Sequence, residues 1–186
     1  MDRLVEAAAG VLVREGLSGF NTNRIAVAAG VGVGSLYEYF PDKDAILERI
    51  IDDMASREAE AIEELLESLA DASLEEVIVA VVTQLVALYR EHLPLYRALR
   101  GVASLRATVG TRPGEQRVLA AVASLVERHG DVLEGLDSQR AAFTLFHLVE
   151  SLAFQMVDQV AETWSPQACI HEIVRAATGY LGLARG

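Results

Sequence analysis

The chain has 186 residues, of which 52% are hydrophobic and 6% aromatic, and its net charge at pH 7 is -11. This length is enough for one ample core or for two units that share their packing. The acidic charge excludes a general polyanion binder, because nonspecific DNA affinity depends on many Lys and Arg side chains that neutralise phosphates. Any contact with nucleic acid must therefore be local.

The cysteine and hydropathy patterns exclude further classes of protein. Cys169 is the only cysteine and has no Cys or His pair beside it at metal-ligand spacing, so we expect no disulfide, no bound metal and no cofactor. The longest apolar stretch, from Val77 to Tyr89, falls short of the roughly 20 residues that span a bilayer, and the N-terminus lacks the features of a signal peptide. The sequence therefore predicts a cytoplasmic protein that does not associate with a membrane.

Apolar residues recur at helical spacing along the whole chain, and no alternating strand pattern interrupts them. The sequence therefore predicts an all-α fold of about nine helices. The expected helices span residues 2–15, two short segments between 21 and 41, and then 43–70, 73–90, 94–104, 115–129, 138–161 and 166–183. We expect two domains, residues 1–50 and residues 51–186.

Residues 21–43 carry the strongest functional pattern. Two short helices separated only by Gly30-Val31-Gly32 must cross steeply, so we expect Ala26 to supply a small residue at the crossing and Gly30 to take a left-handed conformation. The small shared core of this helix-turn-helix is expected to contain Ile25, Ala29, Val31, Val33 and Leu36. The pattern alone leaves open an ordinary αα-hairpin, which also needs a small residue and a glycine.

The flanking residues favour DNA binding over that alternative. Asn21 or Thr22 is expected to cap the first of the two short helices, and Asp42 to cap the helix that follows them. Lys43, the only lysine, falls in the first turn of that following helix, where the helix dipole disfavours a cation. A phosphate there would be held by both the lysine and the free helix N–H groups.

A family resemblance covers residues 4–50. Their sequence is similar to the N-terminal DNA-binding domain of TetR-family regulators, and the match runs through VEAAAGVLVREGLSGFNTNRIAVAAGVGVGSLYEYFPDKDAILERI. In that family a GVSxGxLYxYFxxKxxL pattern marks the recognition helix. The resemblance implies a homodimeric transcription regulator whose recognition helix, here Val33 to Tyr39, enters the major groove of a palindromic operator.

The resemblance also implies roles for individual residues. Val33, Gly34 and Ser35 would approach base edges, and Thr22, Tyr37 and Lys43 would contact phosphates. Tyr39 is ambiguous between these two roles, and Leu36 and Phe40 would pack inside. Asn23 and Arg24 would face the DNA backbone or flanking bases, although an exposed arginine is equally typical of a solvated surface.

Two residues depart from the family pattern. Gly32 stands where relatives usually have a Ser or Thr that caps the recognition helix, and this weakens the cap by a few tenths of a kcal/mol. Glu38 places a negative charge where many relatives have His, Arg or Trp. We therefore expect modest nonspecific binding, with operator affinity that depends on the placement of side chains more than on total charge.

Two helices in the second half of the chain are expected to form a dimer interface. The segment from Phe143 to Val157 is apolar nearly all the way round, so it must be covered on two sides. The last helix presents a second apolar stripe. The expected interface residues are Phe143, Phe146, Val149, Ile170, Ile173, Val174 and Ala177. A monomer that buries both faces in its own core remains the alternative.

Polar side chains on mostly apolar helices are candidates for an effector site, although each could equally be a packed residue with one satisfied hydrogen bond. The candidates are Gln84, Tyr89, His92, Tyr96, Arg100, His147 and Glu150, together with Thr83 and Gln155. His147 and Glu150 lie three residues apart on one helix face, but no third ligand at useful spacing completes a metal site.

Together these patterns predict a DNA-binding regulator that a small apolar or amphipathic effector releases from its operator. The sequence does not decide between a repressor and an activator. The first alternative is a ligand-binding protein of the same fold with weak or no operator binding. A helical enzyme is disfavoured, because no catalytic triad, carboxylate pair in an apolar setting, phosphate loop or metal cluster occurs.

Overall fold

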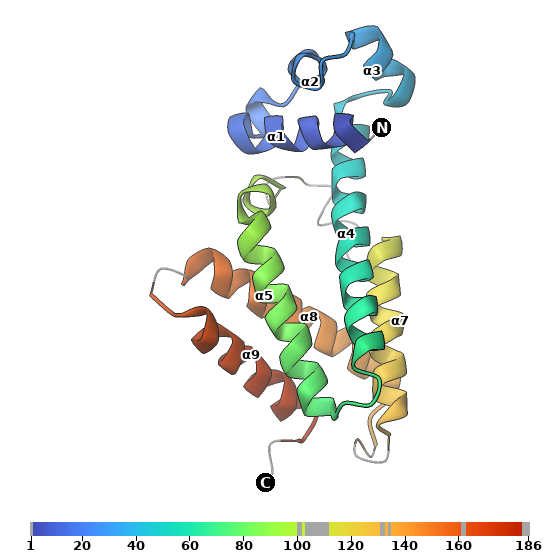
Figure 1. Cartoon of the computed structure of the whole chain (residues 1–186), viewed down its shortest axis with the longest axis vertical. Coiled ribbons are helices and arrows are strands. Elements are labelled where there is room, and N and C mark those ends of the chain that lie inside the picture. Colours follow the sequence, from blue (N-terminus) through green and yellow to red (C-terminus); the bar gives the residue numbers. More distant parts are fainter. Residues whose placement is uncertain are drawn as a thin grey trace. The chain divides into compact units, whose positions relative to one another are not determined.

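The computed structural model of the chain describes residues 2–99, 102, 112–130, 133, 135–160 and 163–183. These residues form eight helices and no strand, which confirms the expected all-α class (Figure 1). The helices are α1 (Asp2–Gly19), α2 (Thr22–Ala29), α3 (Val33–Tyr39), α4 (Lys43–Ser68), α5 (Leu74–Leu99), α7 (Pro113–Arg128), α8 (Ser138–Gln159) and α9 (Pro166–Tyr180).

The chain divides into two compact units. The first, here called unit 1, consists of Met1–Arg57 and Pro94–Pro113, and the second, unit 2, of Glu58–Leu93 and Gly114–Gly186. Helices α4 and α5 therefore contribute residues to both units. Unit 1 holds the expected helix-turn-helix together with the segment Pro94–Pro113, which no sequence pattern assigned to it.

Unit 1 is built around one apolar core. Its buried residues come from α1, α2, α3 and the first turns of α4, and Leu99 and Val102 complete the cluster. The fully buried members are Ala8, Val11, Leu12, Ile25, Ala26, Leu36 and Ile46. Val33 and Ala29 are partly buried against the same cluster, while Val31 of the expected shared core is 39% exposed.

The local signals at the helix ends act as the sequence predicts. The Asn21 side chain accepts a hydrogen bond of 3.0 Å from the Arg24 N–H and caps α2. Gly30 ends α2 with φ of 69°, in the left-handed region that glycine adopts without strain. The Asp42 carboxylate accepts a hydrogen bond of 2.8 Å from the Ala45 N–H at the start of α4. Gly32 precedes α3 without a side-chain cap, as expected.

The first helix has a kink where the sequence predicted its end. Gly16 has φ of 65° and ψ of -178°, so the regular helix is interrupted directly after Glu15. The chain then completes a further short turn to Gly19. This extra turn precedes Phe20, which is buried in the core of unit 1.

The expected break between Arg90 and Pro94 is wrong. Helix α5 runs without interruption from Leu74 to Leu99 and contains Pro94. A proline inside a helix removes one backbone hydrogen bond and destabilises it by about 3 kcal/mol. The helix continues because apolar side chains are buried on both sides of the proline, with Tyr89 before it and Leu99 after it. The predicted helix at 94–104 is thus the end of α5 up to Leu99, and most of its remainder lies outside the described residues.

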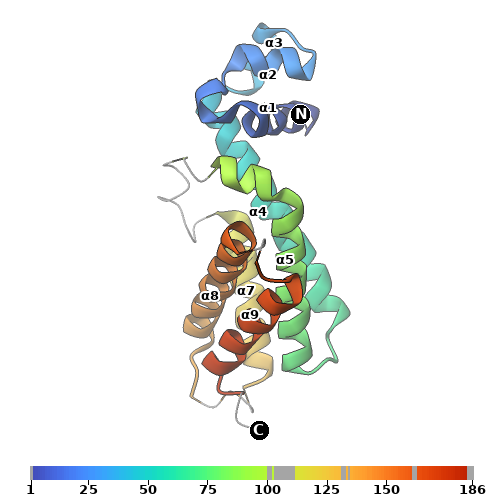
Figure 2. The same cartoon turned by 90° about the vertical axis from the view of Figure 1, so that its left-hand side faces the viewer.

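Unit 2 contains the later part of α4, most of α5, and α7, α8 and α9 (Figure 2). Helices α8 and α9 pack directly against each other. Helix α5 is long and apolar enough to cross a membrane by length and composition alone, but this test is also passed by core helices. Val77, Val82 and Val86 of α5 are buried in unit 2, so packing accounts for their apolar character.

Candidate DNA-binding surface, effector cavity and dimer faces

Three residues expected to contact phosphates gather around one surface hollow in unit 1. The hydroxyl oxygens of Thr22 and Tyr37 lie 3.2 Å apart, within hydrogen-bond distance. Both side chains line a hollow whose other walls are Asn21, Pro41, Asp42 and Lys43. The structure therefore brings Thr22, at the start of α2, together with Tyr37 of α3 and Lys43 of α4.

The local structure explains why these residues meet. The Asn21 cap fixes where α2 begins and so places Thr22 in its first turn. The left-handed Gly30 turns the chain into α3, and the buried side chain of Leu36 holds α3 with Tyr37 facing outward. Because Asp42 caps α4, Lys43 lies in the first turn of this helix, where its side chain is exposed. The hollow thus combines two hydroxyl groups, one ammonium group and a helix N-terminus with the Asp42 carboxylate, which already accepts one of the helix N–H groups. An anion there would be held by the hydroxyl groups, the ammonium group and the remaining N–H groups.

Helix α3 presents a polar face to solvent. Gly34, Ser35, Glu38 and Tyr39 are exposed, so three of the residues expected at or near base edges are accessible. Val33 differs, because it is half-buried and packs partly against the core of unit 1. Only part of the Val33 side chain is therefore available for a thymine methyl.

Asn23 and Arg24 are both exposed on α2. The Arg24 guanidinium forms an ion pair with the Glu15 carboxylate of α1. Both residues, with Asn23, line a second hollow at the junction of α1 and α2. The positive charge of Arg24 is therefore partly neutralised, and the pair stabilises the packing of α1 against α2.

Unit 2 contains an apolar cavity whose lining, in the described part of the chain, includes none of the polar residues expected at an effector site. It encloses about 70 Å³ of free space. Its walls come from α4, α5, α7, α8 and α9. The lining residues are Glu58, Ile62, Leu66, Val77, Ile78, Val81, Val82, Leu85, Val118, Val122, Leu125, Leu145, Phe146, Val149 and Ala177. Glu58 is the one charged residue in this lining.

The polar candidates for an effector site lie elsewhere. Gln84 and His92 are exposed on α5, Tyr96 is half-buried and belongs to unit 1, and Arg100 lies outside the described residues. Tyr89 is buried, and its hydroxyl donates a hydrogen bond of 3.4 Å to Glu58 Oε1. Of the predicted effector residues, Tyr89 thus contacts the cavity lining through Glu58, and His147 contacts it through Phe146.

Two further effector candidates, Thr83 and Gln155, form local hydrogen bonds. Thr83 is exposed, and its hydroxyl donates a hydrogen bond of 2.7 Å to the Val79 carbonyl one turn earlier. Gln155 accepts a hydrogen bond from the side chain of Gln159 on the surface of α8. Each hydrogen bond lies within a single helix, as is typical of an isolated polar residue on a mostly apolar helix.

His147 and Glu150 form a separate cluster on α8. His147 Nδ1 lies 3.7 Å from Glu150 Oε2, and the His147 ring makes edge contacts with Phe143 and Phe146. Burial raises the pKa of Glu150 above its ordinary value, His147 counteracts this shift, and the charge of Glu115 adds to it. No group of three potential metal ligands occurs among the described residues.

The pKa of Glu150 predicts a pH dependence. A raised pKa in the folded state stabilises the fold below the unfolded-state value and loses this contribution as the pH rises through the folded-state pKa. Glu150→Gln removes this dependence, so we expect the variant to gain stability relative to the parent as the pH rises from about 4.5, the ordinary glutamate pKa, through the raised folded-state pKa to about 8. The gain is moderated by solvent, since 41% of the Glu150 side chain is exposed.

Urea unfolding of both proteins at the two pH values measures this difference. Glu64→Gln, at an exposed position of α4, is the matched control and is expected to give the same difference from the parent at both pH values. If the stability of Glu150→Gln relative to the parent fell as the pH rises, this would contradict a raised pKa of Glu150 in the folded state.

The expected dimer residues divide into two groups. Val149, Ile173 and Ala177 are already buried within the single chain, so they have little surface left for a second copy. Phe143 is 56% exposed, and Ile170 and Val174 are half-buried. Phe146 is half-buried and lines the cavity. Of the expected dimer residues, Phe143, Ile170 and Val174 therefore keep surface that a second copy could cover.

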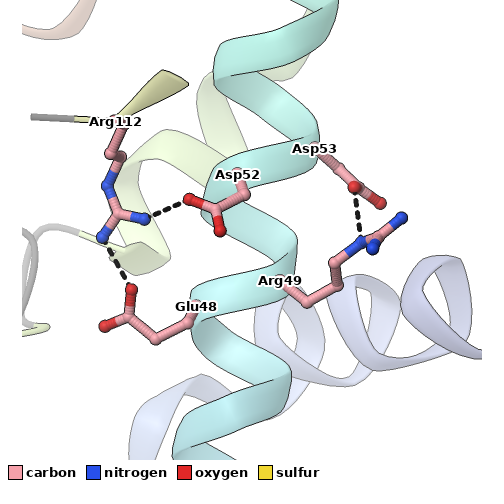
Figure 3. A network of polar contacts seen from close by, with 5 residues as sticks. All are labelled: Glu48, Arg49, Asp52, Asp53 and Arg112. Carbon is pink, nitrogen blue, oxygen red and sulfur yellow. Dashed lines mark hydrogen bonds and ion pairs between the residues drawn. The ribbon is translucent and has the colours of Figure 1, made fainter. Parts of the chain in front are cut away.

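Arg112 anchors a cluster of ion pairs that no sequence pattern indicated (Figure 3). Its guanidinium donates to Glu48 Oε2 at 2.8 Å and also pairs with Asp52, one helical turn further along α4. Desolvation alone would lower the pKa of Arg112, but the hydrogen bonds that Arg112 donates to both carboxylates raise it above its ordinary value. All three residues belong to unit 1, and α7 begins at the next residue, Pro113.

Comparison with protein families identifies both halves of the chain. Residues 4–50 match the family described as bacterial regulatory proteins, tetR family, and residues 73–181 match the tetracyclin repressor-like C-terminal domain. A curated relative, the HTH-type transcriptional repressor DrrR1 of Streptomyces coeruleorubidus, is 37% identical over 92 residues, which cover 50% of this chain. The matched part spans 32% of the length of that relative.

Solved structures show the same fold along nearly the whole chain. A TetR-family transcriptional regulator from Mesorhizobium loti aligns with a TM-score of 0.77 at 21% identity and covers 98% of this chain and 95% of its own. The fatty acid degradation regulator FadR from Bacillus halodurans aligns with a TM-score of 0.74 at 19% identity, covering 99% and 95%. FadR from Bacillus subtilis, solved in complex with stearoyl-CoA, aligns with a TM-score of 0.71 at 20% identity, covering 95% and 96%. Because family models match both its N-terminal and its C-terminal half, the chain belongs to the TetR family of bacterial regulatory proteins.

Proposed function

We propose that this chain is a cytoplasmic, homodimeric repressor that binds palindromic operator DNA and is released by a small apolar or amphipathic effector. Members of its family bind operator DNA and small-molecule effectors and typically form dimers. The observation that carries the proposal is the convergence of Thr22, Tyr37 and Lys43 on one hollow beside the exposed face of α3.

This hollow supports phosphate binding in spite of the acidic charge of the chain. Lys43 supplies a positive charge, the start of α4 supplies the positive end of a helix dipole, and Tyr37 and Thr22 supply hydroxyl donors. Two copies of unit 1 would place two such hollows on DNA, each fixing the register of its recognition helix. Phosphate contacts of this kind position a protein, while α3 reads the bases.

The cavity in unit 2 supports an apolar effector. Its lining is aliphatic or aromatic apart from Glu58, whose carboxylate disfavours a negatively charged group nearby. A hydrocarbon portion of a ligand, such as the acyl chain of the stearoyl-CoA bound to FadR of Bacillus subtilis, fits this chemistry. The free space of about 70 Å³ is small compared with typical ligand pockets of roughly 300 Å³ or more, so an effector would have to move the surrounding helices.

Helix α4 supplies a path from effector to DNA. It carries Lys43 in its first turn and lines the cavity with Glu58, Ile62 and Leu66 in its later turns. An effector that enters the cavity would displace α4 and change the spacing of the two recognition helices. The coupling is the difference in effector affinity between the DNA-bound and released arrangements.

Filling the cavity is expected to weaken release of operator DNA by the effector. Val122→Phe adds a phenyl ring to the α7 wall, and we expect it to keep operator affinity while raising the effector concentration for half-release about tenfold or more. Operator release in a screen of hydrocarbon-chain and polycyclic compounds gives the effector for this titration. Ala120→Phe, exposed on the same helix, is expected to respond like the parent. Normal release by Val122→Phe would argue against this cavity as the effector site.

The proposal is tested by selecting binding sites for the purified protein from random duplex DNA. We expect an enriched inverted repeat, with affinity weakened about tenfold by Tyr37→Ala and by Lys43→Ala, since each removes a hydrogen bond to a charged group. Tyr180→Ala, at an exposed position of unit 2, is the control that should bind like the parent. No enriched sequence at low salt, with folded dimeric protein, would favour the alternative of a ligand-binding protein that does not bind operator DNA.

A further inference from the structure

We infer that Glu38 is a specificity-determining residue that selects a cytosine in each half of the operator. The inference rests on the proposed function, because it takes α3 to be the helix that enters the major groove. Glu38 is the acidic residue of α3, and a negative charge on this helix would weaken general affinity for DNA.

The geometry of α3 places Glu38 at the crest of its exposed face. Leu36 is fully buried and defines the inward direction of the helix. At 3.6 residues per turn, Gly34 and Glu38 both lie close to the opposite direction, one turn apart, while Ser35 and Tyr37 flank them. An object that approaches α3 from solvent therefore meets Glu38 before the other side chains of the helix.

Gly34 leaves the space that the Glu38 side chain needs. Side chains on a helix tilt towards its N-terminus, so the Glu38 carboxylate lies over the turn that contains Gly34. Gly34 has no side chain, and a Cβ added there would have no heavy atom within 4 Å. The carboxylate is thus unobstructed at the part of α3 that would approach base edges most closely.

No ion pair in the described part of the chain engages Glu38, which is exposed. Glu15 differs from Glu38, because Arg24 neutralises the charge of Glu15 within the same unit. Phosphates repel a carboxylate, so in the major groove Glu38 can be accommodated only where a hydrogen-bond donor faces it.

Base chemistry restricts that donor to cytosine. In the major groove, guanine and thymine present acceptors that repel a carboxylate, and the thymine methyl adds bulk. Adenine presents a donor at N6, but its N7 acceptor lies beside that donor and faces the second carboxylate oxygen. Cytosine presents its N4 donor without an adjacent acceptor on the same base, so it is the favoured partner for Glu38.

The experiment compares base preference, not only affinity. Binding sites are selected from random duplex DNA with the full-length parent, Glu38→Gln and Glu6→Gln, and the enriched operator is then titrated in parallel with a cytosine-to-thymine change at each conserved cytosine. For the parent we expect one position per half-site at which thymine weakens binding about tenfold. Glu38→Gln should lose this preference and enrich adenine there, because a Gln amide pairs with N6 and N7.

Glu6→Gln controls for charge alone. Glu6 is exposed on α1 of the same unit, so its removal should raise affinity for every sequence alike and leave the ratio between cytosine and thymine unchanged. An enriched operator whose cytosine-to-thymine ratio is the same for the parent and Glu38→Gln would overturn the inference alone, and would make Glu38 a residue that only weakens nonspecific binding. Failure of the parent to enrich any sequence would overturn the proposed function as well.

Discussion

Replacing Arg112 with Met is expected to lower the free energy of unfolding by about 2 kcal/mol. The Arg112 side chain is only 7% exposed and is held by Glu48 and Asp52. Its loss removes the cation that Glu48 and Asp52, two like charges one helical turn apart on α4, share. Removal of one partner of a fully buried pair costs about 3–5 kcal/mol, and the value is smaller here because the two carboxylates remain 40% and 47% exposed.

The matched control is Arg117→Met, which removes the same chemical group from α7. Arg117 pairs with Glu63 of α4, its Nε donating at 3.0 Å to Glu63 Oε1, but its side chain is 41% exposed. We expect the free energy of unfolding of this control to be close to that of the parent, because exposed ion pairs contribute little to stability. Thermal and urea unfolding at one fixed protein concentration measure both variants. Equal losses from the two substitutions would show that burial of Arg112 is not what makes its ion pairs important.

The same substitution is expected to weaken the response to effector. Arg112 immediately precedes α7, and α7 lines the cavity with Val118, Val122 and Leu125. Arg112 therefore ties the start of a cavity-lining helix to α4 within unit 1. We expect Arg112→Met to bind operator DNA but to show a smaller ratio between its affinities without and with effector. An unchanged ratio would assign Arg112 a role in stability alone.

Ala26→Leu is expected to destabilise unit 1 by about 3 kcal/mol and to abolish operator binding. Ala26 is 1% exposed and packs in the core cluster with Ile25 and Leu36. A larger side chain has no room in a close-packed core and would force α2 and α3 apart. Since the hollow of Thr22, Tyr37 and Lys43 depends on the relative placement of these helices, the phosphate site would be lost with them.

The control for this prediction lies on the same helix. Ala28 is exposed, so Ala28→Leu should change the free energy of unfolding by less than about 0.5 kcal/mol. Urea unfolding compares the two variants, and titration with the selected operator follows their DNA binding. A stable Ala26→Leu variant would mean that α2 and α3 do not need a small residue where they cross.

The helix-turn-helix could be predicted closely from the sequence because its signals act over a few residues. Asn21 and Asp42 bond to backbone N–H groups three residues ahead, and Gly30 takes a left-handed conformation that other residues avoid. These effects do not depend on distant parts of the chain. The family pattern from Val31 to Lys43 added roles for individual residues, and the structure places three of them at one hollow.

The effector cavity was not predictable in the same way. Its lining is almost entirely apolar, and apolar residues at helical spacing indicate burial without indicating an empty space. The isolated polar residues expected at an effector site do not line this cavity: Gln84 and His92 are exposed, and Thr83 bonds within its own helix. Whether Val149 and Ala177 face a cavity, a core or a second copy depends on how five helices pack, which periodicity does not specify.

The sequence by itself determined the all-α class, the ends of the short helices and the recognition-helix pattern, because caps, glycine turns and periodicity are local properties of the backbone. Only the tertiary structure decided that α5 passes through Pro94, that Arg112 pairs with Glu48 and Asp52, and which apolar residues surround the cavity. Each of these depends on contacts between segments distant in sequence. Burial on both sides of Pro94 overrides its local tendency to break a helix, and the carboxylates of Glu48 and Asp52 offset the desolvation cost of burying Arg112.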